Sequence, residues 1–320
     1  MRQVTLVGPG WTGDLIHILA GDATSVEKSN VTLDGDAAAR ALYLARVAGL
    51  PCDSAGEASR VHVVNDVDPH LLAAAAREIL GYFGRVPAEQ LVPRRQMIMS
   101  RAEARLLADR LSAPTELRCR TNLEDVDVDD MSTPHEGFFL TRTYRLRHPQ
   151  FEGGMSHALT REVFVATDAA IVLPYDPVRD RLLLVEQFRM GPFGRGDPFP
   201  WVLEPVAGRV DGGETPEETA RRECLEEADL ELDRLEHVSS HYCSPGCSTE
   251  VFHCYVGLCE LPENGQSHGG LDTENEDLRR HVIAFEQALE MTRSGEVNVG
   301  PLFALLLWLE RERPRLRASA

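Results

Sequence analysis

A strand, a glycine-rich turn and an acidic helix follow one another in the second half of the chain, and this unit constrains the fold more than any other segment. The apolar run WVLEPVA (201–207) is typical of a buried strand, and the glycines directly after it permit tight turns. Thr215, with Glu218 three residues later, has the form of a capping box. The pattern predicts a helix that begins at Thr215 and runs to about Ala228.

The predicted helix is rich in carboxylates. Residues 207–230 hold eight Asp and Glu side chains, and Glu223, Glu226 and Glu227 have the spacing i, i+3 and i+4, which places them on one helix face. Like charges at this spacing destabilise a helix unless a positive group lies among them. A hard divalent cation such as Mg²⁺, which takes oxygen ligands and is often shared with substrate phosphates, is one explanation. A solvated acidic helix face is the alternative.

The composition excludes several classes of partner. The 320 residues carry 33 Lys and Arg against 51 Asp and Glu, a net charge of −18, which repels nucleic-acid phosphates and anionic lipid surfaces. The longest apolar run, 302–309, is far shorter than the roughly 20 residues that span a bilayer. The first residues lack the features of a secretory signal. We therefore expect a cytoplasmic protein that binds neither nucleic acid nor membrane.

The cysteines agree with a reducing compartment. Their number, seven, is odd and they are spread along the chain, unlike a disulfide framework. Cys243 and Cys247, with His241 before them, have the form of half a zinc site, but no second ligand pair follows at zinc spacing. We interpret them as ordinary structural residues.

The chain changes texture at about Leu123. Before it lie short apolar pieces and two helical stretches, 69–86 and 100–111. After it, apolar and polar residues alternate as they do in strands. These strand-like runs are FFLTRTYRLRH (138–148), TREVFVA (160–166), AAIVLPY (169–175) and RLLLVEQF (181–188). We predict a mixed sheet from them.

The acidic segment resembles the Nudix box, a loop, helix and loop signature of hydrolases that cleave a nucleoside diphosphate linked to another group. The pattern is G-x5-E-x7-R-E-U-x-E-E-x-G-U, where U is a bulky apolar residue. It is matched by Gly208, Glu214, Arg222, Glu223, Cys224, Glu226, Glu227 and Leu230. Asp229 stands where the family has Gly. That position ends the helix in a left-handed conformation, which Asp tolerates better than most residues, so we expect a small local cost and an intact metal face.

The flanking segments resemble bacterial ADP-ribose pyrophosphatases. The similar segments are 137–164, 173–192, 243–250 and 269–288, within a resemblance that covers about Leu123 to Glu310. It implies hydrolysis of ADP-ribose to AMP and ribose 5-phosphate, with Mg²⁺ or Mn²⁺ as the cofactor. Pro245 occupies the position beyond the box that marks ADP-ribose specificity in that family.

The resemblance also implies a metal site and a general base. The metal ligands would be the backbone carbonyl of Ala207 and the carboxylates of Glu223, Glu227 and Glu276, with Glu226 assisting. Arg222 and Glu214 would orient these ligands. Glu274 matches the general base that takes a proton from the attacking water, and Glu276 is the alternative base.

Substrate contacts follow from the same resemblance. The resemblance places six residues near the phosphates and the terminal ribose or in the loop beside them: Arg189, Arg209, Ser244, Pro245, Gly246 and Glu250. A strand segment that crosses to a partner subunit and holds the adenosine part would contribute Phe138, Phe139, Arg161 and Glu162. The resemblance thus implies a homodimer with shared active sites. Structural alternatives are a strand core for the phenylalanines, a surface ion pair for Arg161 and Glu162, and charge neutralisation alone for Arg189.

The implied fold class is α/β: a Nudix fold, in which a mixed β-sheet lies between helices, after a small degenerate N-terminal α+β region. We divide the chain into an N-terminal region (1–95), a linker (96–122) and a Nudix hydrolase domain (123–320). Longer members of this branch, some labelled tellurite-resistance proteins, carry an N-terminal segment related to gamma-glutamyl cyclotransferases. Residues 7–21 lack the Tyr-Gly-Thr-Leu substrate loop of that fold, which indicates a non-catalytic remnant.

Two other functions compete with ADP-ribose hydrolysis. One is hydrolysis of a different nucleotide sugar, such as GDP-mannose, because related enzymes share the box. The other, of a different class, is a catalytically inactive Nudix protein that senses a ligand. A sensor does not need a metal site, so the intact Glu223, Glu226 and Glu227 argue against this function.

Overall fold

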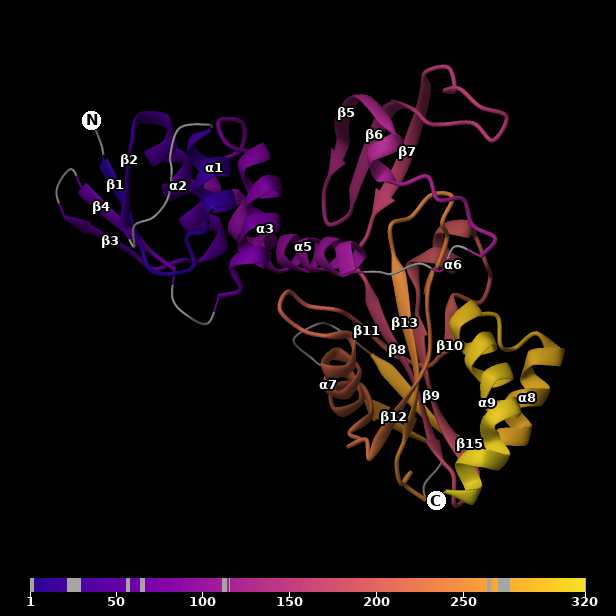
Figure 1. Ribbon diagram of the computed structural model, residues 1–320. Helices are drawn as coiled ribbons and strands as arrows, with labels where there is room; N and C mark the ends of the chain where they lie inside the picture. Colours follow the sequence, from indigo (N-terminus) through magenta and orange to yellow (C-terminus); the bar gives the residue numbers. More distant parts are fainter. Residues whose placement is uncertain are drawn as a thin grey trace. The chain divides into compact units, whose positions relative to one another are not determined.

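The computed structural model describes residues 3–21, 30–55, 58–63, 67–110, 114, 116–263, 266–269 and 277–319. It divides into two compact units (Figure 1). The first consists of residues 1–167, 211–213 and 246–249, and the second of residues 168–210, 214–245 and 250–320.

The N-terminal part of the first unit is an α+β fold around a sheet of strand order β2-β1-β4-β3. The strands are β1 (Gln3–Val7), β2 (Asn30–Asp34), β3 (Cys52–Ala55) and β4 (Ala58–His62). β1 pairs parallel with β4 and antiparallel with β2. The helices are α1 (Gly13–Ala20), α2 (Gly35–Ala48), α3 (Pro69–Gly81), α4 (Ala88–Leu91), the 3₁₀ turn η1 (Val92–Arg94) and α5 (Arg95–Arg110). The expected N-terminal α+β region is therefore confirmed.

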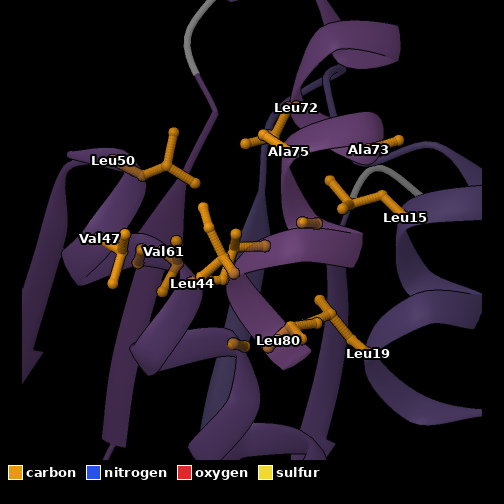
Figure 2. Close-up of a cluster of buried hydrophobic side chains, with 14 of the residues drawn as sticks. Leu15, Leu19, Leu44, Val47, Leu50, Val61, Leu72, Ala73, Ala75 and Leu80 are labelled. Atoms are coloured by element: carbon orange, nitrogen blue, oxygen red, sulfur yellow. The ribbon is translucent and has the colours of Figure 1, made fainter. Parts of the chain in front are cut away.

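Helices α1, α2 and α3 form a common apolar core with this sheet. Figure 2 shows Leu15 of α1, Leu44 of α2, Leu72 of α3 and Val61 of β4 in one cluster of side chains, and all four are buried. The turn after β1 passes very close to the end of β4, because a Cβ on Gly10 would lie 2.1 Å from Cγ1 of Val63. The glycines of this turn thus have a packing role.

Helix α5 occupies part of the predicted linker, residues 96–122. Its Ile98 and Ala102 are buried in the same core. Arg101 of α5 forms a largely buried ion pair with Glu78 of α3, with Arg101 Nε 3.1 Å from Glu78 Oε2. Residues 95–110 are therefore packed against the N-terminal region.

A separate three-stranded antiparallel sheet completes the first unit. After the 3₁₀ turn η2 (Leu123–Asp125) come β5 (Asp127–Glu136), β6 (Leu140–Arg147) and β7 (Leu159–Val165). Their order is β5-β6-β7. Strand β6 begins at Leu140, so Phe138 and Phe139 lie in the turn before it, and the expectation that the strand starts at Phe138 is wrong. Gly137 donates a hydrogen bond from its N–H to the carbonyl of Phe139 at 2.9 Å, which closes this turn.

The second unit contains an eight-stranded mixed sheet. Its strands are β8 (Ala169–Asp176), β9 (Arg181–Phe188), β10 (Trp201–Glu204), β11 (Val206–Arg209), β12 (Arg234–Tyr242), β13 (Val251–Leu258), β14 (Gln266–Gly269) and β15 (Leu278–Ala284). The main order is β12-β13-β8-β9-β15-β14, while β10 pairs with β9 and β11 with β8. The β13–β8 pair is parallel and β12–β13 is antiparallel, as the prediction of a mixed sheet requires.

Helices cover both faces of this sheet (Figure 1). Helix α7 (Pro216–Ala228) packs on one face, where Ala220 and Cys224 join Val172 and Val185 in one apolar cluster. Helices α8 (Phe285–Ser294) and α9 (Gly300–Ala318) bury a second cluster that includes Phe285. A short helix, α6 (Met190–Arg195), lies between β9 and β10. The predicted α/β arrangement, a mixed sheet between helices, is confirmed.

The ends of α7 agree with the sequence-based prediction. Thr215 Oγ1 accepts a hydrogen bond from the Glu218 N–H, and the Glu218 carboxylate accepts one from the Thr215 N–H. Asp229 ends the helix with φ 58° and ψ 39°, in the left-handed region. Asp thus adopts the backbone conformation for which the family uses Gly. None of the helices in the described ranges is long and apolar enough to cross a membrane.

Candidate active site

Strand β11 and helix α7 meet at Gly208. A Cβ at this position would lie 1.8 Å from Oε1 and 1.9 Å from Cδ of Glu223, far inside van der Waals contact. Only glycine therefore lets the Glu223 carboxylate lie against the strand. The box glycine shapes the acidic site directly, as well as the turn that follows it.

Arg222 lies among the helix glutamates and supplies the positive charge that their spacing demands. Its guanidinium donates to Glu214 Oε1 at 2.9 Å, to Glu223 Oε1 at 2.7 Å and to Glu226 Oε2 at 2.9 Å. These contacts, foremost the hydrogen bonds to Glu214, raise the pKa of Arg222 above its usual value. Arg222, itself bonded to Glu214, thus fixes the directions of the Glu223 and Glu226 carboxylates.

Glu227 is the most buried carboxylate of the site, with 2 % of its surface exposed. Its Oε2 accepts a hydrogen bond from the Ala207 N–H at 3.3 Å, which ties the helix to β11. A carboxylate is rarely buried to this degree unless it is paired or binds a metal. The helix face and the adjacent strand therefore bring Ala207, Glu223, Glu226 and Glu227 to one place.

The donors in this place are oxygen atoms, which suits a hard divalent cation such as Mg²⁺. Glu274 and Glu276, the expected base and a further ligand, lie outside the described residues. Among the residues that are described, no three His, Cys, Asp or Glu side chains converge closely enough to hold a metal ion. Glu223 and Glu226 point instead to Arg222, so the donor types fit a cation while the described side chains are arranged around a guanidinium.

The expected substrate residues of the second unit surround the ends of β9, β11, β12 and β13. Arg189 follows β9, and its Nε lies 2.7 Å from Glu204 Oε2. Arg209 ends β11 opposite Ala169. Ser244 and Pro245 are exposed in the loop after β12. Glu250 precedes β13, and its Oε2 accepts a hydrogen bond from the Cys243 thiol at 3.1 Å.

Burial raises the pKa of the Glu250 carboxyl above its usual range. The Cys243 hydrogen bond and the charge of Arg189 oppose this rise, while Asp168 adds to it. Glu250 is therefore a half-buried carboxylate, and its pKa depends on the groups around it.

The remaining expected contacts belong to the first unit. Phe138 and Phe139 are 66 % and 49 % exposed, which excludes a core role for either. Phe139 contacts Phe164 of β7 with ring centroids 4.9 Å apart. Arg161 and Glu162 are exposed on β7, and Gly246 is exposed in the loop between β12 and β13. These side chains are available to a ligand or to another chain.

The second unit also contains a buried polar pair close to Glu250, which the sequence alone does not indicate. Asp168, 4 % exposed, contacts His253 Nε2 through its Oδ2 at 3.1 Å, and His253 is 7 % exposed. The Ser240 hydroxyl lies 2.9 Å from the other ring nitrogen, Nδ1. The partners are 85 residues apart in the chain, so only the pairing of β8 with β13 brings them together.

The second unit thus combines a mixed sheet between helices with a glycine-shaped loop and a glutamate-rich helix on one face. The NUDIX domain matches residues 166–303, and the chain belongs to the Nudix family. It is a Nudix hydrolase.

Similar proteins support this placement. The chain is 38 % identical over 204 residues to the ADP-ribose pyrophosphatase of Escherichia coli (strain K12), which covers 64 % of this chain and 97 % of that protein. It is 36 % identical over 198 residues to the ADP-ribose pyrophosphatase of Haemophilus influenzae, which covers 61 % and 91 %. The GDP-mannose pyrophosphatase of Escherichia coli O9:H4 (strain HS) is 32 % identical over 150 residues, 47 % of this chain and 77 % of that protein. This chain is longer than these relatives, in agreement with its extra N-terminal region.

Proposed function

We propose that the protein hydrolyses the diphosphate of ADP-ribose to AMP and ribose 5-phosphate, with Mg²⁺ as its cofactor and Mn²⁺ as a substitute. One observation carries this proposal. A protein named ADP-ribose pyrophosphatase aligns over 97 % of its length at 38 % identity, and the Nudix box of this chain retains its arginine and glutamates on a single strand, loop and helix. The name of this relative and the retained box residues therefore support the same activity.

The residues of the site account for the reaction through position and charge. A bound divalent cation would neutralise the diphosphate and lower the pKa of a water molecule. Ala207, Glu223, Glu227 and Glu276 would hold it, with Glu226 assisting. Arg222 holds the carboxylates of Glu223 and Glu226 in their orientation, and Glu214 holds the Arg222 guanidinium. Catalysis of phosphoryl transfer needs little more than such positioning.

The proton of the attacking water goes to a carboxylate, and we assign this role to Glu274, with Glu276 as the alternative. Arg189 and Arg209 would bind the diphosphate and terminal ribose, beside the loop that carries Ser244, Pro245, Gly246 and Glu250. Attack of water on one phosphorus atom breaks the bond from that atom to the bridging oxygen, which leaves with the other phosphate, so the adenosine and the ribose each keep one phosphate. AMP and ribose 5-phosphate are therefore the products, and ADP with free ribose is excluded.

The adenosine part would be held by an exposed segment of a second subunit. Phe138 and Phe139 are exposed in a turn, and Arg161 and Glu162 are exposed on β7. Exposed aromatic side chains next to charged ones suit a nucleoside or a protein contact. We therefore keep the homodimer with shared sites as part of the proposal.

The organisation of the rest of the chain is also a proposal. We assign residues 123–320 to the Nudix hydrolase domain, 96–122 to a connecting segment and 1–95 to a degenerate cyclotransferase-like region without catalysis. All seven cysteines are in the reduced form in the structure, which favours the reducing cytoplasm. The link to tellurite resistance stays a prediction, and loss of tolerance in a deletion strain is its test.

A second candidate substrate is GDP-mannose, because a GDP-mannose pyrophosphatase is 32 % identical over 150 residues. The Pro245 loop and Arg189 follow the ADP-ribose pattern instead. A ligand sensor without activity is disfavoured, since Arg222, Glu223 and Glu226 retain an organised site.

The test is a comparison of kcat/KM for ADP-ribose, GDP-mannose and NADH, with product identification by chromatography. We expect ADP-ribose to be preferred by at least ~10-fold, which corresponds to about 1.4 kcal/mol of barrier. A reversed ratio assigns the site to the other nucleotide sugar. No hydrolysis of any diphosphate with Mg²⁺ or Mn²⁺ present leaves the sensor as the function.

A further inference from the structure

Two hydrogen bonds close the neck of the loop that joins β12 to β13. Strand β12 ends at Tyr242 and β13 begins at Val251, so Cys243 and Glu250 are the first residues beyond each strand. The Cys243 N–H donates to the Glu250 carbonyl at 3.1 Å. The Cys243 thiol donates to Glu250 Oε2, also at 3.1 Å. The backbone bond fixes the ends of the loop, and the thiol bond fixes the direction of one carboxylate.

Charged groups beside β8 and β9 influence the Glu250 carboxylate. Asp168 at the start of β8 and Arg189 after β9 act on it by charge, and Cys243 acts on it by hydrogen bonding. Arg189 is itself engaged by Glu204 at 2.7 Å. Asp168 is engaged by His253 at 3.1 Å. Among these three groups the thiol is a neutral donor, and its hydrogen bond to Glu250 is directional.

We propose that Cys243 is a positioning residue for substrate binding, and that its thiol holds the Glu250 carboxylate in the orientation that accepts a hydrogen bond from a sugar hydroxyl. This inference rests on the proposed function, in which Glu250 contacts the substrate. A carboxylate that is free to rotate must be ordered each time the substrate binds, whereas a tethered carboxylate is ordered in advance. Cys243 thereby contributes to the affinity for the substrate.

Removal of the thiol has two consequences of different kinds. Substrate binding weakens, because the carboxylate loses its fixed direction. The pKa of Glu250, which burial already raises and the Cys243 hydrogen bond lowers, rises further when that bond is lost. The ionised carboxylate is present above its pKa and becomes protonated as the pH falls through that pKa. A higher pKa therefore moves the acidic limb of the activity profile to higher pH.

Four variants separate positioning from a general packing effect. Cys243→Ala removes the donor, Cys243→Ser keeps a donor of nearly the same size, and Glu250→Gln removes the charge. Cys52→Ala, at an exposed cysteine in the first unit, is the matched control. Steady-state hydrolysis of ADP-ribose is measured for each from pH 4.5 to 9, with thermal unfolding as a check of the fold.

We expect Cys243→Ala to raise KM by about 3- to 10-fold with kcat nearly unchanged, as the loss of one hydrogen bond predicts. The acidic limb of kcat/KM should move up by roughly 0.4 to 1 pH unit. Cys243→Ser should restore both quantities, and Cys52→Ala should change neither. A KM and an acidic limb in Cys243→Ala that equal those of the wild type overturn the inference, as does a Cys243→Ser variant that behaves like Cys243→Ala.

The outcome for Glu250→Gln separates this inference from the proposed function. If the wild type hydrolyses ADP-ribose and Glu250→Gln leaves KM unchanged, the positioning role falls and the activity stands. If the wild type does not hydrolyse ADP-ribose, the activity falls, and the thiol contact is tested by the alkylation rate of Cys243 with iodoacetamide, followed by peptide mass spectrometry. A carboxylate that accepts the thiol proton disfavours the reactive thiolate, so Glu250→Gln should accelerate alkylation, and an unchanged rate rejects the contact.

Discussion

Gly208→Ala tests whether the strand and the helix of the box are fitted to each other at atomic resolution. The added Cβ would lie 1.8 Å from Glu223 Oε1 and 1.9 Å from its Cδ. Ordinary contact needs about 3.5 Å, so the carboxylate or the strand must move by roughly 1.6 Å. Glu223 is held by Arg222 at 2.7 Å, and its displacement therefore breaks an ion pair as well.

We expect Gly208→Ala to lower kcat/KM for ADP-ribose at least ~100-fold, because an error of about 1 Å in a positioned group has this effect. Overpacking should also destabilise the fold by about 1–3 kcal/mol. Initial rates of AMP release measure the first effect, and thermal unfolding followed by circular dichroism measures the second.

Gly191→Ala is the control, since a Cβ at Gly191 in α6 meets no atom within 4 Å. It should leave both the rate and the stability close to the wild type. A folded Gly208→Ala protein with kcat/KM within threefold of the wild type, roughly 0.6 kcal/mol of barrier, would refute the reasoning.

Three further predictions concern the box and the assembly. Glu227→Gln should lower kcat by at least ~100-fold at saturating Mg²⁺ with little change in the far-ultraviolet circular dichroism, and near-normal turnover would remove Glu227 from the metal ligands. Asp229→Gly should stabilise the fold by roughly 0.5 kcal/mol, seen as a higher melting temperature, because Gly adopts the left-handed conformation without strain; a lower melting temperature contradicts this. Light scattering should show a dimer at micromolar concentration, and mixing inactive Glu227→Gln with inactive Arg161→Ala chains should restore part of the activity if sites are shared; an active monomer excludes this assembly.

The sequence predicts the box well because its determinants are local. The capping residues Thr215 and Glu218 lie within one helical turn, and each reads directly as a hydrogen bond in the structure. The left-handed end of α7 at Asp229 follows from a single position in the pattern. The orienting role of Arg222 comes from the family resemblance, and in the structure its side chain contacts Glu223 and Glu226 on the same helix.

Long-range contacts and turns are where the sequence falls short. The alternation of FFLTRTYRLRH predicts a strand from Phe138, yet the structure turns there and exposes both rings, since alternation alone does not fix where pairing begins. The pairing of β1 with β4 and the contact between Asp168 and His253 join residues more than fifty positions apart. No local propensity encodes such partners, because they depend on how the sheet is assembled.

Arg222 has a consequence for the protein in the absence of any cofactor. Its guanidinium contacts three carboxylates, so one positive charge already offsets part of the negative charge of the acidic face. We therefore expect the fold to form without a metal, unlike the folding of small domains that require an ion. A cation at the proposed site would compete with the guanidinium for the same oxygen atoms. Turnover would then follow the free divalent-cation concentration, while the folded fraction of the protein would not.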